Sequence, residues 1–276
     1  MIETEDLPGR NVTFAQPDRG DDLSPDLTDD AFLGGALRIL QPKAGYRAGV
    51  DALLLAAAVS QRGGRRSLRV LDIGAGVGTV GMSVARRLGA TEVTLVEAEP
   101  GLSALALRNI ARNGLSGRVR AITADINGPA AELQALGLAS DCFDHVVANP
   151  PFHVEGRGTP APVPIKAAAH AMPEEALDHW VRVMARYVAP GGLATMIHKA
   201  DALGLILAAF QGRFGALSIL PIHPRRGEAA IRVLVTGTKG SRAPLSLREG
   251  FVLHDAGHDF TPKAAGILRH GDGLEV

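Results

Sequence analysis

The sequence lacks several features that mark particular classes of protein. It contains one cysteine, Cys142, which rules out a disulfide within the chain and fits a reducing compartment. It has no apolar run that approaches the roughly 20 residues of a membrane-spanning helix. Its acidic N-terminus shows nothing of the basic and then apolar pattern of a signal peptide. These absences predict a soluble, cytoplasmic protein with no membrane partner.

Net charge is absent as well, because 29 basic residues balance 29 acidic ones. The distribution is nevertheless uneven: residues 1–30 hold nine acidic and two basic residues, and the rest of the chain holds 27 basic against 20 acidic ones. A basic body suits a polyanionic partner such as a nucleic acid. Residues 1–30 show no periodic apolar pattern, so we expect a disordered acidic tail there.

Beyond this tail, short apolar segments alternate with helical ones. Strands are predicted over residues 68–73, 93–97, 119–123, 143–148, 193–198, 217–222 and 230–236. Helices are predicted over residues 51–59, 78–88, 102–113, 174–188 and 202–211. Such alternation favours an α/β fold, a Rossmann-like doubly wound parallel sheet, which we expect to form one domain over residues 31–276. Ligands of such sheets bind at the carboxyl ends of the strands.

The first predicted strand of the sheet runs into a glycine-rich loop, Asp72-Ile-Gly-Ala-Gly-Val-Gly78. Glycines let the backbone turn tightly and approach a ligand, and the following helix presents free amide groups. Part of the loop, Gly76-x-Gly-x-x-Gly81, also matches the pattern of NAD sites. A carboxylate ahead of the first glycine suits an ammonium group and repels a pyrophosphate, so Asp72 favours S-adenosylmethionine. The predicted cofactor contacts are Asp72, Gly74, Ala75 and Gly76.

Two further acidic residues follow neighbouring strands. Glu97 ends the second strand of the sheet, where a carboxylate can accept hydrogen bonds from both hydroxyls of a ribose. Glu99 lies two residues further and is the weaker candidate for that role. Asp125 follows the third strand, where it can accept a hydrogen bond from an adenine amine. Together with the glycine loop, Glu97 and Asp125 form a predicted cofactor site.

The motif Asn149-Pro-Pro-Phe152 directly follows the fourth strand. An amine on an aromatic ring or amide is a poor nucleophile, because its lone pair is delocalised. The side-chain oxygen of Asn149 and the carbonyl of Pro150 can accept its two N–H groups and orient the nitrogen. The prolines, Pro150 and Pro151, hold that carbonyl rigidly, and Phe152 offers a face on which a base can stack. We predict that these four residues form the catalytic site of an amino-methyltransferase.

With these motifs, the chain resembles the class I S-adenosylmethionine-dependent methyltransferases. Within that class, the segment Gln41-Pro-Lys-Ala-Gly-Tyr-Arg-Ala-Gly-Val-Asp-Ala-Leu-Leu-Leu55 is similar to the bacterial tRNA(Val) adenine-N6 methyltransferases. The resemblance implies methylation of N6 of an adenosine in tRNA and a seven-stranded, mostly parallel sheet with the last strand antiparallel. It also implies that residues 31–62 form a helical cover over the cofactor site, with Tyr46, Arg47 and Asp51 nearby.

Other functions stay open at this point. The motif followed by His153 also resembles the guanine-N2 methyltransferases of rRNA, and its Asn-Pro-Pro core occurs in glutamine-N5 methyltransferases of release factors. An NAD-dependent oxidoreductase would use the glycine loop but leaves Asn149–Phe152 unexplained. An RNA-binding module without catalysis would have no use for an aligned amine acceptor. His254 and His258 have a spacing that suits a metal, but no companion ligand accompanies them, so we expect none.

Overall fold

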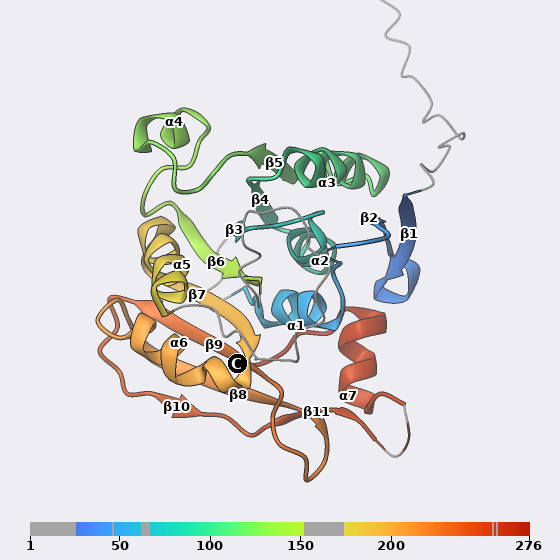
Figure 1. Ribbon diagram of the computed structural model, residues 1–276, viewed down its shortest axis with the longest axis vertical. Helices are drawn as coiled ribbons and strands as arrows, with labels where there is room; N and C mark the ends of the chain where they lie inside the picture. Colours follow the sequence, from blue (N-terminus) through green and yellow to red (C-terminus); the bar gives the residue numbers. More distant parts are fainter. Residues whose placement is uncertain (1–25, 46, 62–66, 152–173, 256, 258) are drawn as a thin grey trace, which may run out of the picture.

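The structure consists of one large sheet between two layers of helices, with a separate two-stranded hairpin beside it (Figure 1). It is a computed structural model, and it describes residues 26–45, 47–61, 67–151, 174–255, 257 and 259–276. Within these ranges, no helix combines the length and the apolar character that crossing a membrane requires.

The central sheet contains all seven strands that the sequence predicts. They are β3 (Leu68–Ile73), β4 (Thr91–Glu97), β5 (Val119–Thr123), β6 (Phe143–Ala148), β7 (Val188–Lys199), β8 (Phe214–Arg225) and β9 (Arg232–Lys239). Their order across the sheet is β5-β4-β3-β6-β7-β9-β8. The strands from β5 to β7 are parallel, whereas β9 is antiparallel to both of its neighbours. The doubly wound topology with a reversed last strand is therefore confirmed.

Two short strands extend the sheet beyond β8. These are β10 (Ser246–Leu247) and β11 (Phe251–His254), and both run parallel to β8. The sequence analysis did not predict them, because segments this short carry too little alternation of apolar and polar residues to be recognised.

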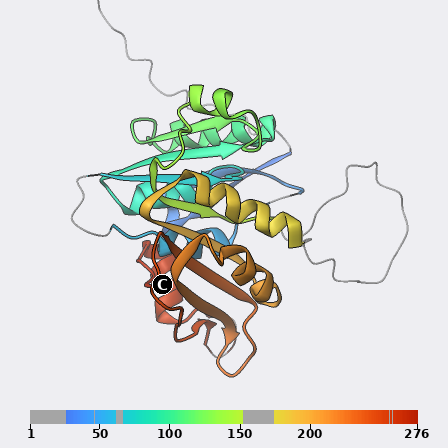
Figure 2. The same ribbon diagram turned by 90° about the vertical axis from the view of Figure 1, so that its left-hand side faces the viewer.

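Helices cover both faces of the sheet. One face carries α1 (Val50–Ala58), α2 (Thr79–Arg87) and α3 (Pro100–Arg112), and the other carries α4 (Ala130–Ala135), α5 (Glu174–Tyr187) and α6 (Leu203–Phe210). α5 and α6 lie side by side in both views (Figures 1 and 2). The remaining short elements are α7 (Pro262–Ala265), η1 (Leu33–Gly35), η2 (Ala200–Ala202) and η3 (Gly266–His270).

Each face of the sheet closes its own apolar core. Alternate side chains of a strand point to opposite faces, so Val70 of β3 packs into the core beneath α1–α3, whereas Leu71 and Ile73 pack into the core beneath α4–α6. Burial on both sides explains why β3 reads as a nearly continuous apolar run, which made its bounds predictable from the sequence.

The hairpin consists of β1 (Leu27–Phe32) and β2 (Leu37–Pro42), which are antiparallel. Two asparagines of the α3 segment bind the backbone of β2. The fully buried Asn109 accepts a hydrogen bond from Leu40 N (2.8 Å) and donates to Leu40 O (3.0 Å). Asn113, one helical turn later, exchanges the same pair of hydrogen bonds with Arg38, at 2.9 and 2.8 Å. The two side-chain amides thus take the place of a neighbouring strand.

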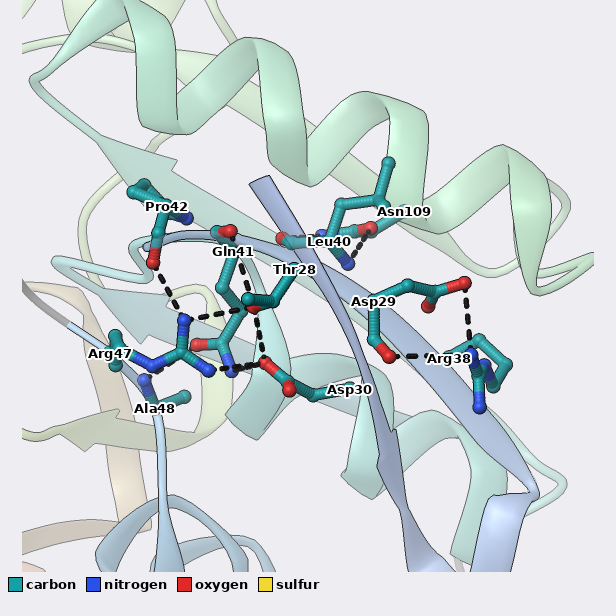
Figure 3. A network of polar contacts seen from close by, with 10 residues as sticks. All are labelled: Thr28, Asp29, Asp30, Arg38, Leu40, Gln41, Pro42, Arg47, Ala48 and Asn109. Atoms are coloured by element: carbon teal, nitrogen blue, oxygen red, sulfur yellow. Dashed lines mark hydrogen bonds and ion pairs between the residues drawn. The ribbon is translucent and has the colours of Figure 1, made fainter. Parts of the chain in front are cut away.

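Strand β1 corrects the predicted extent of the acidic tail. Residues 27–30 were expected to be disordered, but they pair with β2, and their carboxylates form ion pairs with Arg38 and Arg47 (Figure 3). Asp29 forms ion pairs with Arg38 (3.0 Å) and Arg112 (2.9 Å), and the Arg112 contact above all lowers the pKa of Asp29. Residues 1–25 of the predicted tail lie outside the described residues. The described part of the expected helical cover, residues 31–62, contains the hairpin and one α-helix, α1.

Candidate active site

The carboxyl ends of four parallel strands meet at one edge of the sheet. Ile73 at the end of β3 pairs with Val96 of β4 on one side and with Ala148 of β6 on the other. Glu97 at the end of β4 pairs with Thr123 of β5. The structure therefore brings these predicted site residues to one edge: Gly74, Ala75, Gly76, Glu97, Asp125, Asn149 and Pro150.

The glycine loop after β3 is a tight turn. The N–H groups of Gly74 and Ala75 both donate to the carbonyl of Val96, at 2.9 and 3.0 Å. Gly74 and Gly76 have φ angles of 66° and 55°, in the left-handed region that residues with a side chain disfavour. The loop thus turns away from the sheet with no side chain at either position, and its backbone can come close to a ligand.

Asp72 lies beneath this loop rather than on its open side. Its carboxylate is 1% exposed and accepts a hydrogen bond from the N–H of Gly81 (3.0 Å) in the first turn of α2. Gly78, at the N-cap of α2, has no side chain to do this, so Asp72 supplies the capping oxygen from β3. Burial raises the pKa of Asp72 to about 7; the Gly81 hydrogen bond opposes this shift, and the charge of Glu97 adds to it. The contact of Asp72 with a cofactor ammonium stays a prediction.

Glu97 lies against the glycine loop. One carboxylate oxygen accepts a hydrogen bond from Gly76 N (2.8 Å), and the other accepts one from Glu99 N (2.9 Å). The side chain of Glu99 instead accepts hydrogen bonds from Gly101 N (3.0 Å) and Leu102 N (2.6 Å), which makes it the N-cap of α3. The structure therefore places Glu97, and not Glu99, at the loop.

Asp125 lies in the turn that follows β5. Its carboxylate accepts a hydrogen bond from Asn127 N (2.9 Å), and its carbonyl accepts one from Gly128 N (2.8 Å). The side-chain amide of Asn127 is hydrogen-bonded to the ring of His179. The turn that carries Asp125 is thereby connected to helix α5.

The segment after β6 begins at Asn149, which is partly buried, and continues with the buried Pro150 and the exposed Pro151. Phe152, the fourth residue of the predicted catalytic motif, lies outside the described residues. Asn149 directly follows Ala148, the partner of Ile73, so it lies beside the start of the glycine loop. An amide oxygen and a rigid carbonyl next to a cofactor loop can together receive the two N–H groups of an amine.

Trp180 of α5 is a residue of this site that the sequence analysis missed. A Cβ atom added to Gly74 would lie 2.6 Å from Cη2 and 3.3 Å from Cζ3 of its indole ring, so the ring is packed directly against the loop. On the sequence, Trp180 fits the apolar stripe of an amphipathic helix, and only the rarity of the residue, with one tryptophan in the chain, distinguishes it.

The N-terminal segment supplies Arg47 and Asp51, which the resemblance places near the cofactor site. Arg47 donates to Thr28 Oγ1 and Pro42 O, both at 2.8 Å, and to Asp30 Oδ2 at 2.6 Å (Figure 3). It therefore ties the hairpin to the start of α1, beside a groove of about 580 Å³, and has no hydrogen bond to the glycine loop among those observed in the described residues. Asp51 pairs with Arg232 (2.8 Å), and Tyr46 lies outside the described residues.

Within the part of the chain that the structure describes, no group of three or more histidine, cysteine or carboxylate side chains is arranged to hold a metal ion. The ring of His254 stacks on Phe260, with 4.7 Å between the ring centroids, whereas His258 lies outside the described residues.

Comparisons with known proteins find methyltransferases among the similar sequences and structures. The methyltransferase small domain family matches residues 48–179. The structure resembles that of a predicted O-methyltransferase from Agrobacterium tumefaciens, with a TM-score of 0.68 and 33% identity over 82% of this chain and 99% of that one. A tRNA1(Val) (adenine(37)-N6)-methyltransferase of Actinobacillus pleuropneumoniae is 26% identical over 81% of this chain and 89% of its own length. A 4-amino-L-phenylalanine/4-methylamino-L-phenylalanine methyltransferase of Streptomyces pristinaespiralis is 32% identical over 62% of this chain and 58% of its own length.

Proposed function

We propose that this chain, a member of the methyltransferases, is an S-adenosylmethionine-dependent enzyme that methylates N6 of an adenosine in tRNA. One observation carries the proposal. The amine acceptors Asn149 and Pro150 lie on the same sheet edge as the glycine loop and Glu97, so an amine and a cofactor would meet there.

The residues around the glycine loop fit S-adenosylmethionine. Gly74 and Gly76 leave the turn without side chains, and the carboxylate of Glu97 already accepts a hydrogen bond from the loop. In this proposal Glu97 accepts hydrogen bonds from the ribose hydroxyls, Asp125 accepts one from the adenine amine, and Asp72 supports the loop from beneath. When bound, S-adenosylmethionine supplies an electrophilic methyl group.

Asn149 and Pro150 would orient the nitrogen that is methylated. The exocyclic amine of adenine has two N–H groups, and the side-chain oxygen of Asn149 and the carbonyl of Pro150 can accept one each. Pro150 is buried and Pro151 follows it, so φ is fixed at both residues and the carbonyl is held in one direction. Orientation is the main contribution, because a methylated nitrogen that carries a positive charge loses its proton readily to water.

Two observations support RNA as the substrate. The relative from Actinobacillus carries the name of a tRNA adenine-N6 methyltransferase. The sheet edge also carries cations beyond Asn149, because Lys199 ends β7, Arg225 ends the parallel strand β8, and Arg232 begins β9. Cations along one edge suit the phosphates of a nucleic acid, which position a substrate without reading its sequence.

The helical cover remains part of the proposal. The first turn of α1 reaches the catalytic edge, where Asp51 pairs with Arg232. This contact supports residues 31–62 as a wall of the site on the side of β9, although Arg47 is engaged in the hairpin.

The test is incubation of the purified protein with labelled S-adenosylmethionine and either unmodified tRNA or unmodified rRNA, followed by nucleoside analysis. Label in N6-methyladenosine from tRNA is the expected result. Label in N2-methylguanosine from rRNA would support methylation of an amine but contradict adenine as the methylated base. Ribose 2′-O-methylation is scored as well, because the Agrobacterium structure carries the name of an O-methyltransferase, and label there would refute amine transfer.

Two variants distinguish the proposed role of Asn149 in catalysis from that of Glu97 in cofactor binding. Asn149→Ala is expected to lower kcat about 100-fold or more, because the acceptor amine loses its orientation, while S-adenosylhomocysteine still binds. Glu97→Gln should show the opposite pattern, a weaker affinity for S-adenosylhomocysteine with a smaller effect on kcat at saturation. A parallel loss of binding and turnover in Asn149→Ala would refute its assigned role.

A small aromatic amine is the second candidate substrate. The Streptomyces relative carries the name of a methyltransferase for 4-amino-L-phenylalanine, whose ring amine presents the same two N–H groups. Incubation with 4-amino-L-phenylalanine in place of RNA tests this candidate directly. The glutamine-N5 alternative is tested in the same way with a release factor as the acceptor.

A further inference from the structure

Trp180 lies at the centre of the region where the loops of the candidate site approach helix α5. Its indole ring contacts the loop at Gly74, the first glycine after β3, closely enough that a Cβ atom there would lie 2.6 Å from Cη2. The residue is partly buried. The ring packs against the core beneath α4–α6 and also against the glycine loop.

The neighbouring residue fixes where α5 lies relative to the other loop of the site. His179 is hydrogen-bonded to Asn127, two residues after Asp125. Ile126 and Trp180 are both partly buried and pack against the same apolar core. The residue next to Trp180 is thus connected to the turn after β5.

The chemistry of an indole ring at this place points to one ligand group. An aromatic face gains most from a flat, polarisable partner, and stacking on a nucleobase is among the strongest contacts that a tryptophan makes. The adjacent carboxylates, Glu97 and Asp125, are the residues proposed for the ribose and the adenine amine. The methionine part of the cofactor has no aromatic ring that could stack on an indole.

We propose that Trp180 forms the aromatic wall of the adenosine half of the cofactor site. The inference rests on the proposed use of S-adenosylmethionine and does not depend on the identity of the methylated substrate. It also gives Gly74 a second function, because any side chain at that position would occupy the space of the ring. The glycine is required for its positive φ and equally for the approach of Trp180.

Since Trp180 is the single tryptophan of the chain, its fluorescence reports on the wall without any label. Wild-type protein is titrated with S-adenosylhomocysteine, with adenosine alone and with methionine alone, and binding is measured in parallel by calorimetry. Quenching or a spectral shift with S-adenosylhomocysteine and adenosine, and none with methionine, is the expected result. If calorimetry detects S-adenosylhomocysteine binding while the emission of Trp180 stays unchanged, the proposed contact between Trp180 and the adenosine half is refuted. The proposed use of S-adenosylmethionine would still be supported. If nothing binds, the proposed function itself fails.

Variants of Trp180 distinguish a cofactor contact from simple packing. Trp180→Ala is expected to weaken S-adenosylhomocysteine binding roughly tenfold by calorimetry, and Trp180→Phe should recover most of it, because stacking needs an aromatic ring. KM for S-adenosylmethionine should rise while kcat changes less. Trp180→Leu keeps apolar volume without a ring, and a Kd equal to that of Trp180→Phe would overturn the stacking role.

Asp178→Asn is the matched control on the same helix. It removes the ion pairs to Arg182 (2.5 Å) and Arg213 (2.7 Å) on the outer side of α5 and leaves the indole in place. Its cofactor affinity is expected to match that of the wild type. An equal loss of affinity in Asp178→Asn and Trp180→Ala would show that the stability of the helix, and not the ring, determines binding, and would refute the proposal.

Discussion

The two faces of the sheet hold the glycine loop in different ways. On the α1–α3 face, the buried amide of Asn109 donates to Val77 O (3.1 Å) while it also binds the backbone of β2. On the α4–α6 face, the contact observed is the van der Waals approach of Trp180 to Gly74. One face fixes the loop through directional hydrogen bonds, and the other touches it with an apolar surface.

The two faces therefore have different effects on the loop. A buried hydrogen-bonding group has few alternative geometries, because any shift leaves a polar atom unsatisfied. An aromatic ring can shift by a fraction of an ångström at little cost, since no single contact dominates. The α1–α3 face thus defines the shape of the loop, and the α4–α6 face offers a surface that can adapt to a ligand.

The largest expected effect concerns Asp72, the buried carboxylate that caps α2. Its pKa of about 7 in the folded protein lies above the ordinary value of 3.8, so the folded state binds the proton more tightly. The free energy of unfolding should therefore fall as the pH rises from about 4 to about 7, by on the order of 4 kcal/mol.

Asp72→Asn should remove that pH dependence, and urea denaturation between pH 4 and pH 8 measures it. The variant is expected to exceed the wild type in stability at pH 8 and to approach it near pH 4. Parallel pH profiles for the two proteins would show that the carboxylate is charged in the fold over the whole range.

The second-largest effect is expected when the hydrogen bonds of Asn109 are removed. Asn109→Ala leaves the N–H and carbonyl of Leu40 and the carbonyl of Val77 without their partner, and it should lower the free energy of unfolding by about 3 kcal/mol. Asn113→Ala is the matched variant at the more exposed end of the same pairing, with an expected loss of about 1 kcal/mol. Equal losses for the two would argue against a special role of burial.

A further effect is expected when the contact between Trp180 and Gly74 is changed. Gly74→Ala adds a methyl group 2.6 Å from the indole and strains a φ of 66°, and the strain alone should cost about 1–2 kcal/mol. Combining it with Trp180→Ala should relieve the collision and leave the strain, so the double variant is expected to be more stable than the sum of the two single changes. Strict additivity in thermal unfolding would mean that ring and loop do not touch.

The smallest effect is expected at the surface of the α4–α6 face. Asp178 has a lowered pKa, chiefly through its hydrogen bond to Arg182, and the arginine side chain is 63% exposed. Exposed ion pairs add little to stability, so Asp178→Asn should leave Tm nearly unchanged at moderate salt. A decrease in Tm as large as that of Asn109→Ala would contradict the comparison of the two faces. It would mean that polar contacts are as important for stability on the α4–α6 face as on the α1–α3 face.

The sequence predicted the parts of the fold that depend on local pattern. The bounds of β3, β5 and β6 agree with the predicted ones: β3 and β6 are buried along most of their length, whereas the edge strand β5 carries both buried and exposed residues. The hairpin was missed because β1 reads Leu-Thr-Asp-Asp-Ala-Phe, and its acidic residues are satisfied by Arg38, Arg47 and Arg112. No local pattern indicates such partners.

The same limit applies to the site. Glu97 could be predicted because a strand end and a glycine loop are both visible in the sequence. The capping of α2 by Asp72 had a weaker sign, a glycine at a position where a capping side chain is usual. Trp180 had only its rarity, because its contact with Gly74 joins two segments that are far apart in the chain.

The pairing of Asn113 with β2 also affects the chemical lifetime of the protein. Asn113 precedes Gly114, and in an Asn-Gly dipeptide the backbone nitrogen of the glycine readily attacks the side-chain amide, which releases ammonia and leaves an acid. In the fold, Gly114 N donates to Ala111 O (3.0 Å), and the amide nitrogen of Asn113 donates to Arg38 O (2.8 Å). Both reactants are thus held in other hydrogen bonds, so deamidation at this site should proceed mainly through molecules whose hairpin has opened.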